Sequence, residues 1–99
     1  MANIESSYSE MMSQLTELVL KTKDREAKKV LRDKHKEMRI KLKKIIDLDI
    51  EKSTKEYEKL MNSLEKVNHS IHESLKDVNR VNDTINFLTQ SLNIIGKLI

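Results

Sequence analysis

The most regular feature of the chain is a seven-residue repeat of apolar side chains that extends from Tyr57 to Ile99. With Tyr57 as position a of a heptad abcdefg, twelve of the thirteen a and d positions are apolar, and Ser74 is the exception. Such a repeat keeps apolar side chains on one stripe of a helix, and other helices must cover that stripe. We therefore predict a helix-packing seam formed by Tyr57, Leu60, Leu64, Val67, Ile71, Val78, Val81, Ile85, Leu88, Leu92 and Ile95.

The polar seam residue Ser74 has two interpretations. A polar d position lowers stability while it fixes the register or the choice of partner. Alternatively, the neighbouring Leu75 rotates inward and covers Ser74.

The N-terminal half carries a less regular version of the same pattern. The pattern slips between Thr22 and Glu26 and then resumes on one face from Ala27 to Ile45. A slip of this kind marks either a local change of supercoil or a break in the helix. Because neither Gly nor Pro stands at the slip, the sequence favours one continuous helix.

A turn is predicted near residues 47–54, where Ser53 and Glu56 have the spacing of a capping box. The turn would separate two arms of equal length, residues 5–48 and 54–97. Each arm would be about 65 Å long at about 1.5 Å per residue. Antiparallel pairing of the arms would place residues 87–98 beside residues 8–20.

The predicted fold is thus all-α, a single domain over residues 1–99 in which a long antiparallel helical hairpin packs as a coiled coil. A two-stranded coiled coil usually carries Glu and Lys at its e and g positions. Here these positions are mostly small or amide-bearing, which favours a broader contact between helices. Completion into a three- or four-helix bundle by oligomerisation or by a partner is therefore expected, and one long helix in a parallel coiled coil is the rival. The small or amide-bearing e and g residues are Ser63, Asn68, Ser70, Asn82, Thr84, Thr89 and Ser91.

Composition agrees with a helical chain, because Pro is absent, Gly occurs once and 35% of the residues are charged. The first twenty residues contain no Lys or Arg, unlike the start of a secretory signal peptide. No apolar run reaches the roughly 18–20 residues that would span a bilayer. The expected location is cytoplasmic, or exported without a cleavable signal peptide.

Charge is unevenly distributed, since residues 21–44 hold twelve Lys or Arg against four Asp or Glu. A surface of one sign could follow an acidic protein surface, lipid headgroups or a phosphate backbone, or it could simply be solvated. No aromatic residues alternate with the cations, as stacking on bases would need. This basic stripe consists of Lys21, Arg25, Lys28, Lys29, Arg32, Lys36, Arg39 and Lys43.

A candidate partner surface lies near the C-terminus, where Phe87, Ile94 and Leu98 widen the apolar face beyond the a and d positions. Either the N-terminal arm or a partner protein could cover it.

The sequence predicts neither a catalytic nor a cofactor-binding residue, and the chain is not expected to be an enzyme. His69 and His72 lie about one helical turn apart, with Glu65 one turn earlier. This spacing can bring metal ligands together, but the residues fall at outward heptad positions with no fourth ligand, so no metal site is predicted.

These observations predict a non-enzymatic protein–protein interaction module (an adaptor, small chaperone or assembly subunit) that supplies amphipathic helices to a larger bundle. Length and predicted shape are similar to those of two groups of small helical-hairpin proteins, one that pairs with exported bacterial substrates and one that chaperones secretion components. The similarity implies association with a bacterial secretion system. It is architectural and covers no motif, because the better-defined group has a Trp-x-Gly turn and this chain lacks Trp. The alternatives are a nucleic-acid-associated helical oligomer that binds through residues 21–44, and a structural spacer.

Overall fold

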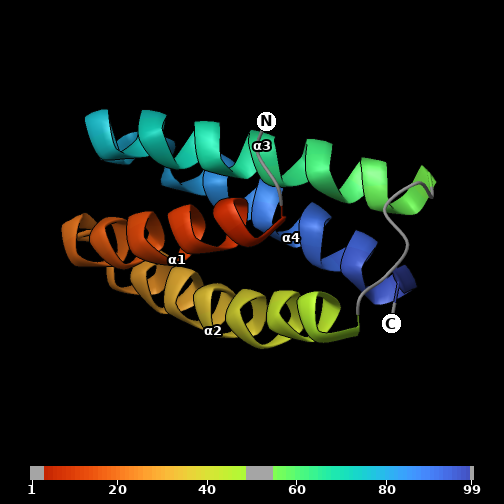
Figure 1. The fold of residues 1–99 in the computed structure, drawn as a ribbon. Coiled ribbons are helices and arrows are strands. Elements are labelled where there is room, and N and C mark those ends of the chain that lie inside the picture. Colours follow the sequence, from red (N-terminus) through yellow and green to blue (C-terminus); the bar gives the residue numbers. More distant parts are fainter. Residues whose placement is uncertain (1–3, 49–54, 99) are drawn as a thin grey trace.

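The chain folds into four helices that pack against one another (Figure 1). The computed structural model describes residues 4–48 and 55–98. Within these residues there is no strand, and all but residues 22–24 and Asp77 are helical. The all-α prediction is therefore confirmed. The helices are α1 (Ile4–Lys21), α2 (Arg25–Leu48), α3 (Lys55–Lys76) and α4 (Val81–Leu98), and a short 3-10 turn, η1 (Val78–Arg80), leads into α4.

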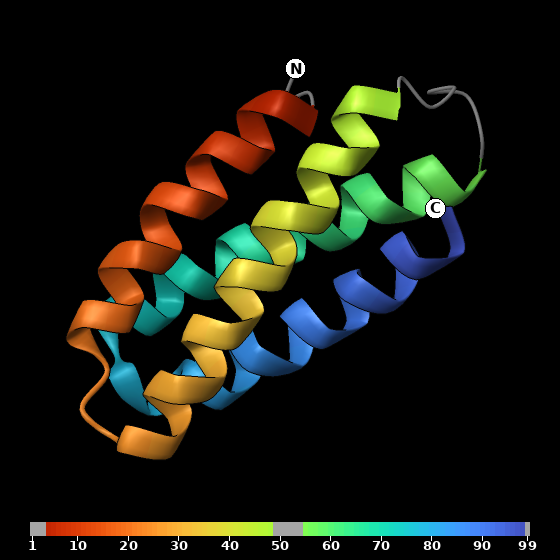
Figure 2. The same cartoon turned by 90° about the horizontal axis from the view of Figure 1, so that it is seen from below.

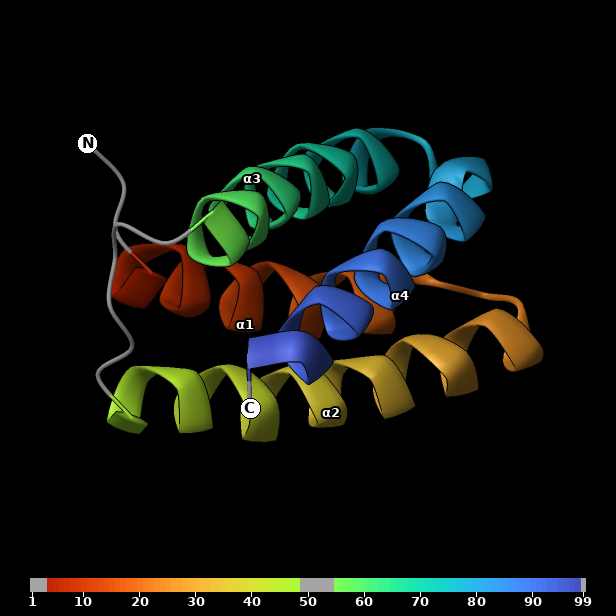
Figure 3. The ribbon, with the colours of Figure 1, turned by 90° about the vertical axis from the view of Figure 1, so that its right-hand side faces the viewer.

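The four helices form two antiparallel pairs that are stacked on each other. Helix α1 runs beside α2, α3 runs beside α4, and Figure 2 shows the two pairs crossing at an angle. Between the pairs, α1 packs on α3 and α2 packs on α4. The colours of Figure 1 show that α1 and α3 run in the same direction. Seen from the side, α1 and α4 lie between α3 and α2 (Figure 3).

The molecule is much shorter than the predicted hairpin. Its principal extents are 39 × 24 × 18 Å, whereas an unbroken arm would measure about 65 Å. The prediction of two continuous arms is wrong, because each arm is interrupted near its middle and folds back on itself.

The first interruption lies at residues 22–24, where the sequence pattern slips. The Thr22 hydroxyl donates to the carbonyl of Leu18 (2.7 Å) as α1 ends. Asp24 then caps α2, because its Oδ2 accepts a hydrogen bond from the backbone N–H of Ala27 (2.9 Å). An Asp side chain satisfies a free N–H of a new first turn in this way without any help from Gly or Pro. The slip is thus a break in the helix and not a change of supercoil.

The second interruption lies at Asp77, inside the predicted unbroken heptad run. Asp77 has extended backbone angles (φ −144°, ψ 101°), and its carboxylate accepts from the backbone N–H of Asn79 (3.1 Å). Its carbonyl accepts from the backbone N–H of Arg80 (3.0 Å), which closes η1. The predicted seam position Val78 consequently lies in the turn and is 39% exposed.

A single core fills the space between the four helices. Met11, Leu15, Leu31, Met38 and the seam residues of α3 are fully or almost fully buried in it. The helices that cover the predicted seam therefore come from the same chain, and neither a second copy nor a partner is needed to bury it. Helix α4 packs mainly on α2 and α3, so the predicted pairing of residues 87–98 with residues 8–20 is wrong.

Two predictions fall outside the described residues. Ser53 of the predicted capping box lies in segment 49–54, and Ile99, the last residue of the predicted heptad repeat, lies beyond the described residues. Helix α2 ends at Leu48 and α3 begins at Lys55, on either side of the predicted turn.

Candidate protein-interaction surface

The predicted seam forms the interior of the bundle and is not itself a binding surface. Nine of its eleven residues are buried. Val78 is exposed at the turn, and Ile85 is only half-buried on the side of α4. The seam prediction is thus wrong for Val78, which lies in the turn after Asp77, whereas Ile85 packs against the edge of the core.

The contact between α3 and α4 is made by small hydroxyl side chains. Ser63 Oγ lies 2.5 Å from Ser91 Oγ, and Ser70 Oγ lies 2.8 Å from Thr84 Oγ1. These pairs stand 28 and 14 residues apart, symmetrically about Asp77, so two g positions of α3 face two g positions of α4. Small side chains at these positions allow the two helices to approach closely and satisfy each other's buried hydroxyls.

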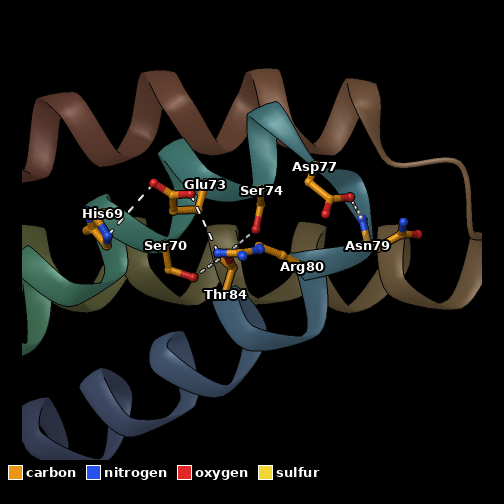
Figure 4. Close-up of polar contacts among 8 residues, drawn as sticks. All are labelled: His69, Ser70, Glu73, Ser74, Asp77, Asn79, Arg80 and Thr84. Atoms are coloured by element: carbon orange, nitrogen blue, oxygen red, sulfur yellow. Dashed lines mark hydrogen bonds and ion pairs between the residues drawn. The ribbon is translucent and has the colours of Figure 1, made fainter.

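Thr84 also forms a hydrogen bond with Ser74, the polar residue of the seam. Ser74 Oγ lies 2.8 Å from Thr84 Oγ1, and both side chains are completely buried. Figure 4 shows Ser70 and Ser74 converging from α3 on Thr84 of α4. Ser74 therefore contributes to the register between α3 and α4, and Leu75 remains half-buried beside it.

Three polar side chains contact one another on the outside of the same helix pair. Glu73 Oε1 lies 4.0 Å from His69 Nε2, and Glu73 Oε2 lies 3.6 Å from Arg80 Nη1 (Figure 4). All three side chains are at least one-third exposed, so each pair stabilises the fold only slightly.

A shallow groove follows α3 and α4, and its first hollow borders these contacts at His69. Its first hollow, of about 420 Å³, is lined by Asn62, Lys66 and Phe87, among others. Its second hollow, of about 280 Å³, shares Asn62 and Lys66 and ends at Ile94. The structure thus places Phe87 and Ile94, two of the three residues of the candidate partner surface, along one groove between two helices.

The third residue, Leu98, continues the same line of α4. Phe87, Ile94 and Leu98 are separated by seven and four residues, so they lie on one side of the helix. All three are half-buried and pack against the edge of the core. We call Phe87, Ile94 and Leu98 the apolar row. It is half-exposed because the inner side of α4 is already occupied by Thr84, Leu88, Ser91 and Ile95.

The basic stripe lies on a different part of the molecule. Lys21 ends α1, where it pairs weakly with Glu17 (4.0 Å), and the other seven residues lie on α2. Six of these seven are exposed, and Lys28 is half-buried.

The three histidines do not gather at one site. His72 Nε2 lies 3.1 Å from Glu10 Oε1 of α1, whereas His69 turns toward Glu73. Among the described residues no three potential ligands gather at a metal-binding distance. His35 is half-buried on α2, where burial and, to a lesser degree, the nearby Arg39 lower its pKa from the ordinary value.

One long-range interaction and one unsatisfied polar atom were not predicted from the sequence. The bridge from Glu10 to His72 joins α1 to α3, and no local pattern indicates it because the partners are 62 residues apart. The Oδ1 atom of Asn68 is buried without a hydrogen-bond partner among the described residues. Only the small e and g residues gave a sign of the hydroxyl cluster.

Comparison with protein-family models, with curated proteins and with solved structures gives no match for this chain. None of the described helices is both long and apolar enough to cross a membrane.

Proposed function

We propose that this chain is a non-enzymatic protein-interaction module, an adaptor, small chaperone or assembly subunit, that binds an amphipathic helix of a partner protein in the groove between α3 and α4. The observation that carries the proposal is the apolar row, which lies half-exposed beside the two hollows. A helix bound there would form a local three-helix bundle with α3 and α4.

The dimensions of the groove suit a helical segment. The apolar row extends over twelve residues of α4, and the eleven steps from Phe87 to Leu98 correspond to about 16 Å or three turns of a partner helix. Its members occur at the spacing that faces one neighbouring helix. Most of the other apolar side chains of α3 and α4 are enclosed in the core, whereas the apolar row lies at its edge.

Charge indicates the chemistry of the partner helix. Lys66 lines both hollows, whereas the carboxylate of Glu65 lines only the first. Lys66 forms no ion pair within residues 4–48 and 55–98, and Lys59 is paired with Glu56 (3.6 Å). A carboxylate beside the apolar face of the partner helix would pair with Lys66 at the centre of the groove.

The test compares proteins recovered with tagged wild-type protein and with variants from the cells that produce it. In Phe87→Ser/Ile94→Ser the apolar row is removed, and in Lys66→Glu the central charge is reversed. Leu20→Ser is the matched control, because Leu20 is 73% exposed on α1, outside the groove. We expect the same protein to be recovered with wild type and Leu20→Ser, weakly with Lys66→Glu, and not with the double variant.

Two results would contradict the proposal. Circular dichroism must first show that the double variant keeps its helical content. If the double variant then retains every protein that wild type retains, the groove is not the binding surface. If light scattering shows a wild-type dimer that the double variant dissociates, a second copy occupies the groove.

A further inference from the structure

A straight row of six cations lies on the outward side of α2. We call Arg25, Lys29, Arg32, Lys36, Arg39 and Lys43 the cation row, and all six are exposed. From Arg25 to Lys43 the row is about 27 Å long at about 1.5 Å per residue. At about 100° per residue its members fall within a sector of about 80° of the helix.

The cation row is not neutralised within the described residues. None of its six members forms an ion pair there, although the chain makes such pairs elsewhere, such as Lys41 with Glu37 (3.8 Å) on the same helix. Like charges three and four residues apart on a helix repel each other and lower its stability. An opposite charge supplied from outside would remove this repulsion.

The spacing of the cation row is that of a helix-to-helix contact. Arg25, Arg32 and Arg39 repeat every seven residues, and a lysine follows each of them after four residues. A seven-residue repeat matches the repeat of a second helix packed alongside. Arginine at each repeat suits carboxylates, because its planar guanidinium binds a carboxylate through two parallel hydrogen bonds.

The borders of the cation row favour a protein helix over a nucleic acid. Ile40, which is 56% exposed, stands directly beside the row and offers an apolar contact. Beyond Ile40 the same helix presents the carboxylates of Glu26 and Asp33, so the row has a negative border along its first half, while Lys44 lies on this side near its end. A polyanion wider than one helix would meet these carboxylates, and α2 contains no Phe, Tyr or Trp to stack on bases.

We propose that the cation row is a second interaction surface that binds an acidic α-helix of a protein, with carboxylates repeating every three to four residues along one side and an apolar residue opposite Ile40. The surface is independent of the groove between α3 and α4, because it lies on α2.

The test measures binding of two labelled synthetic peptides by fluorescence anisotropy. One is an alanine-based helix with glutamates at alternating three- and four-residue spacing, and the other has the same composition with the glutamates spread around the helix. We expect the first peptide to bind at least about tenfold more tightly at about 150 mM salt, and its affinity to fall as salt rises. In Arg25→Gln/Arg32→Gln/Arg39→Gln this tenfold preference should disappear.

The control variant is Lys34→Gln/Lys41→Gln/Lys44→Gln, which removes the same charge from α2 outside the cation row and should keep the preference. Equal affinity for both peptides would overturn the proposal, because binding would then depend on net charge alone. Tighter binding of a random DNA duplex than of the first peptide, lost in the arginine variant, would make the row a nucleic-acid surface. Absence of binding to either peptide at about 150 mM salt would also overturn it.

Discussion

Replacing Thr84 by Val tests whether the buried hydroxyl cluster holds α3 against α4. Thr84 is fully buried, and its hydroxyl lies 2.8 Å from both Ser70 Oγ and Ser74 Oγ. Valine has nearly the same shape, so the change removes the hydroxyl and leaves two buried serine hydroxyls without this partner.

The expected cost follows from those two groups. A buried polar group left without a partner costs about 1–3 kcal/mol. Each serine can recover part of this by turning toward the carbonyl four residues earlier in α3. We therefore expect Thr84→Val to lower the free energy of unfolding by about 2 kcal/mol, and to lower Tm by about 10 °C for a chain of this length.

The assay is urea and thermal unfolding followed by circular dichroism, with Thr89→Val as the matched control. Thr89 is on the same helix and donates to the carbonyl of Ile85 (3.0 Å), but it is exposed, so its loss should cost less than about 0.5 kcal/mol. The combined variant Ser70→Ala/Ser74→Ala/Thr84→Val should recover part of the loss, because no hydroxyl is then left without a partner. Equal stability of the two valine variants would refute the role of the cluster.

Three further predictions follow from the breaks and the core. Asp24→Ala should lower the free energy of unfolding by about 1 kcal/mol in urea unfolding, because α2 loses its cap, and Asp24→Asn should retain most of it. Ile71→Asp should lower the free energy of unfolding by more than about 4 kcal/mol, because Ile71 is fully buried. The same change should cost about 1–3 kcal/mol at half-buried Ile85 and less than about 1 kcal/mol at exposed Val78. Equal losses at the three positions would contradict the break at Asp77 and support one unbroken helix. Because burial lowers the pKa of His35 in the folded chain, the unfolded chain binds that proton more tightly. The free energy of unfolding should therefore fall as the pH falls through the ordinary pKa of 6.5. Over the same pH range, the free energy of unfolding of His35→Gln should fall less than that of wild type.

The seven-residue pattern predicted the helical class and much of the packing. It succeeded even across the break, because the hydroxyl pairs Ser63–Ser91 and Ser70–Thr84 lie two heptads and one heptad on either side of Asp77. Folding back at Asp77 therefore keeps the repeat in register, and the repeat alone does not distinguish one long helix from two short ones.

Local sequence marked the position of the first break but did not distinguish it from a change of supercoil, and it did not mark the second break. Asp24 and Asp77 act as caps, but aspartate is also common on the exposed side of an uninterrupted helix, and neither break contains Gly or Pro. Breaking both arms became favourable because four short helices bury the apolar stripes of both arms in one core, which is a property of the whole chain. The slip between Thr22 and Glu26 was the local sign of the first break.

The candidate surfaces were predictable to different degrees. Phe87, Ile94 and Leu98 stood out in the sequence because they lie off the seam, but the groove beside them depends on how α4 packs on α3. The basic stripe was predicted as a set of residues, whereas its division into a straight row of six and two residues outside that row required the break between Lys21 and Arg25.

Closure of the core within one chain changes which features of the molecule are free to bind. An open hairpin would have to cover its apolar stripes with other chains, so its seam would determine its partners. In the folded chain Leu60, Leu64, Val67 and Ile71 are fully buried, so they are not accessible to a partner. What remains outside is the apolar row, which packing on α3 leaves half-exposed, and the cation row, which no described residue neutralises. Both are positioned by the breaks, since Asp77 sets the direction of α4 and Asp24 sets the start of α2. In the two proposals made for this protein, binding specificity would therefore depend on these outer surfaces and on the two aspartates that orient them, more than on the repeat that dominates its sequence.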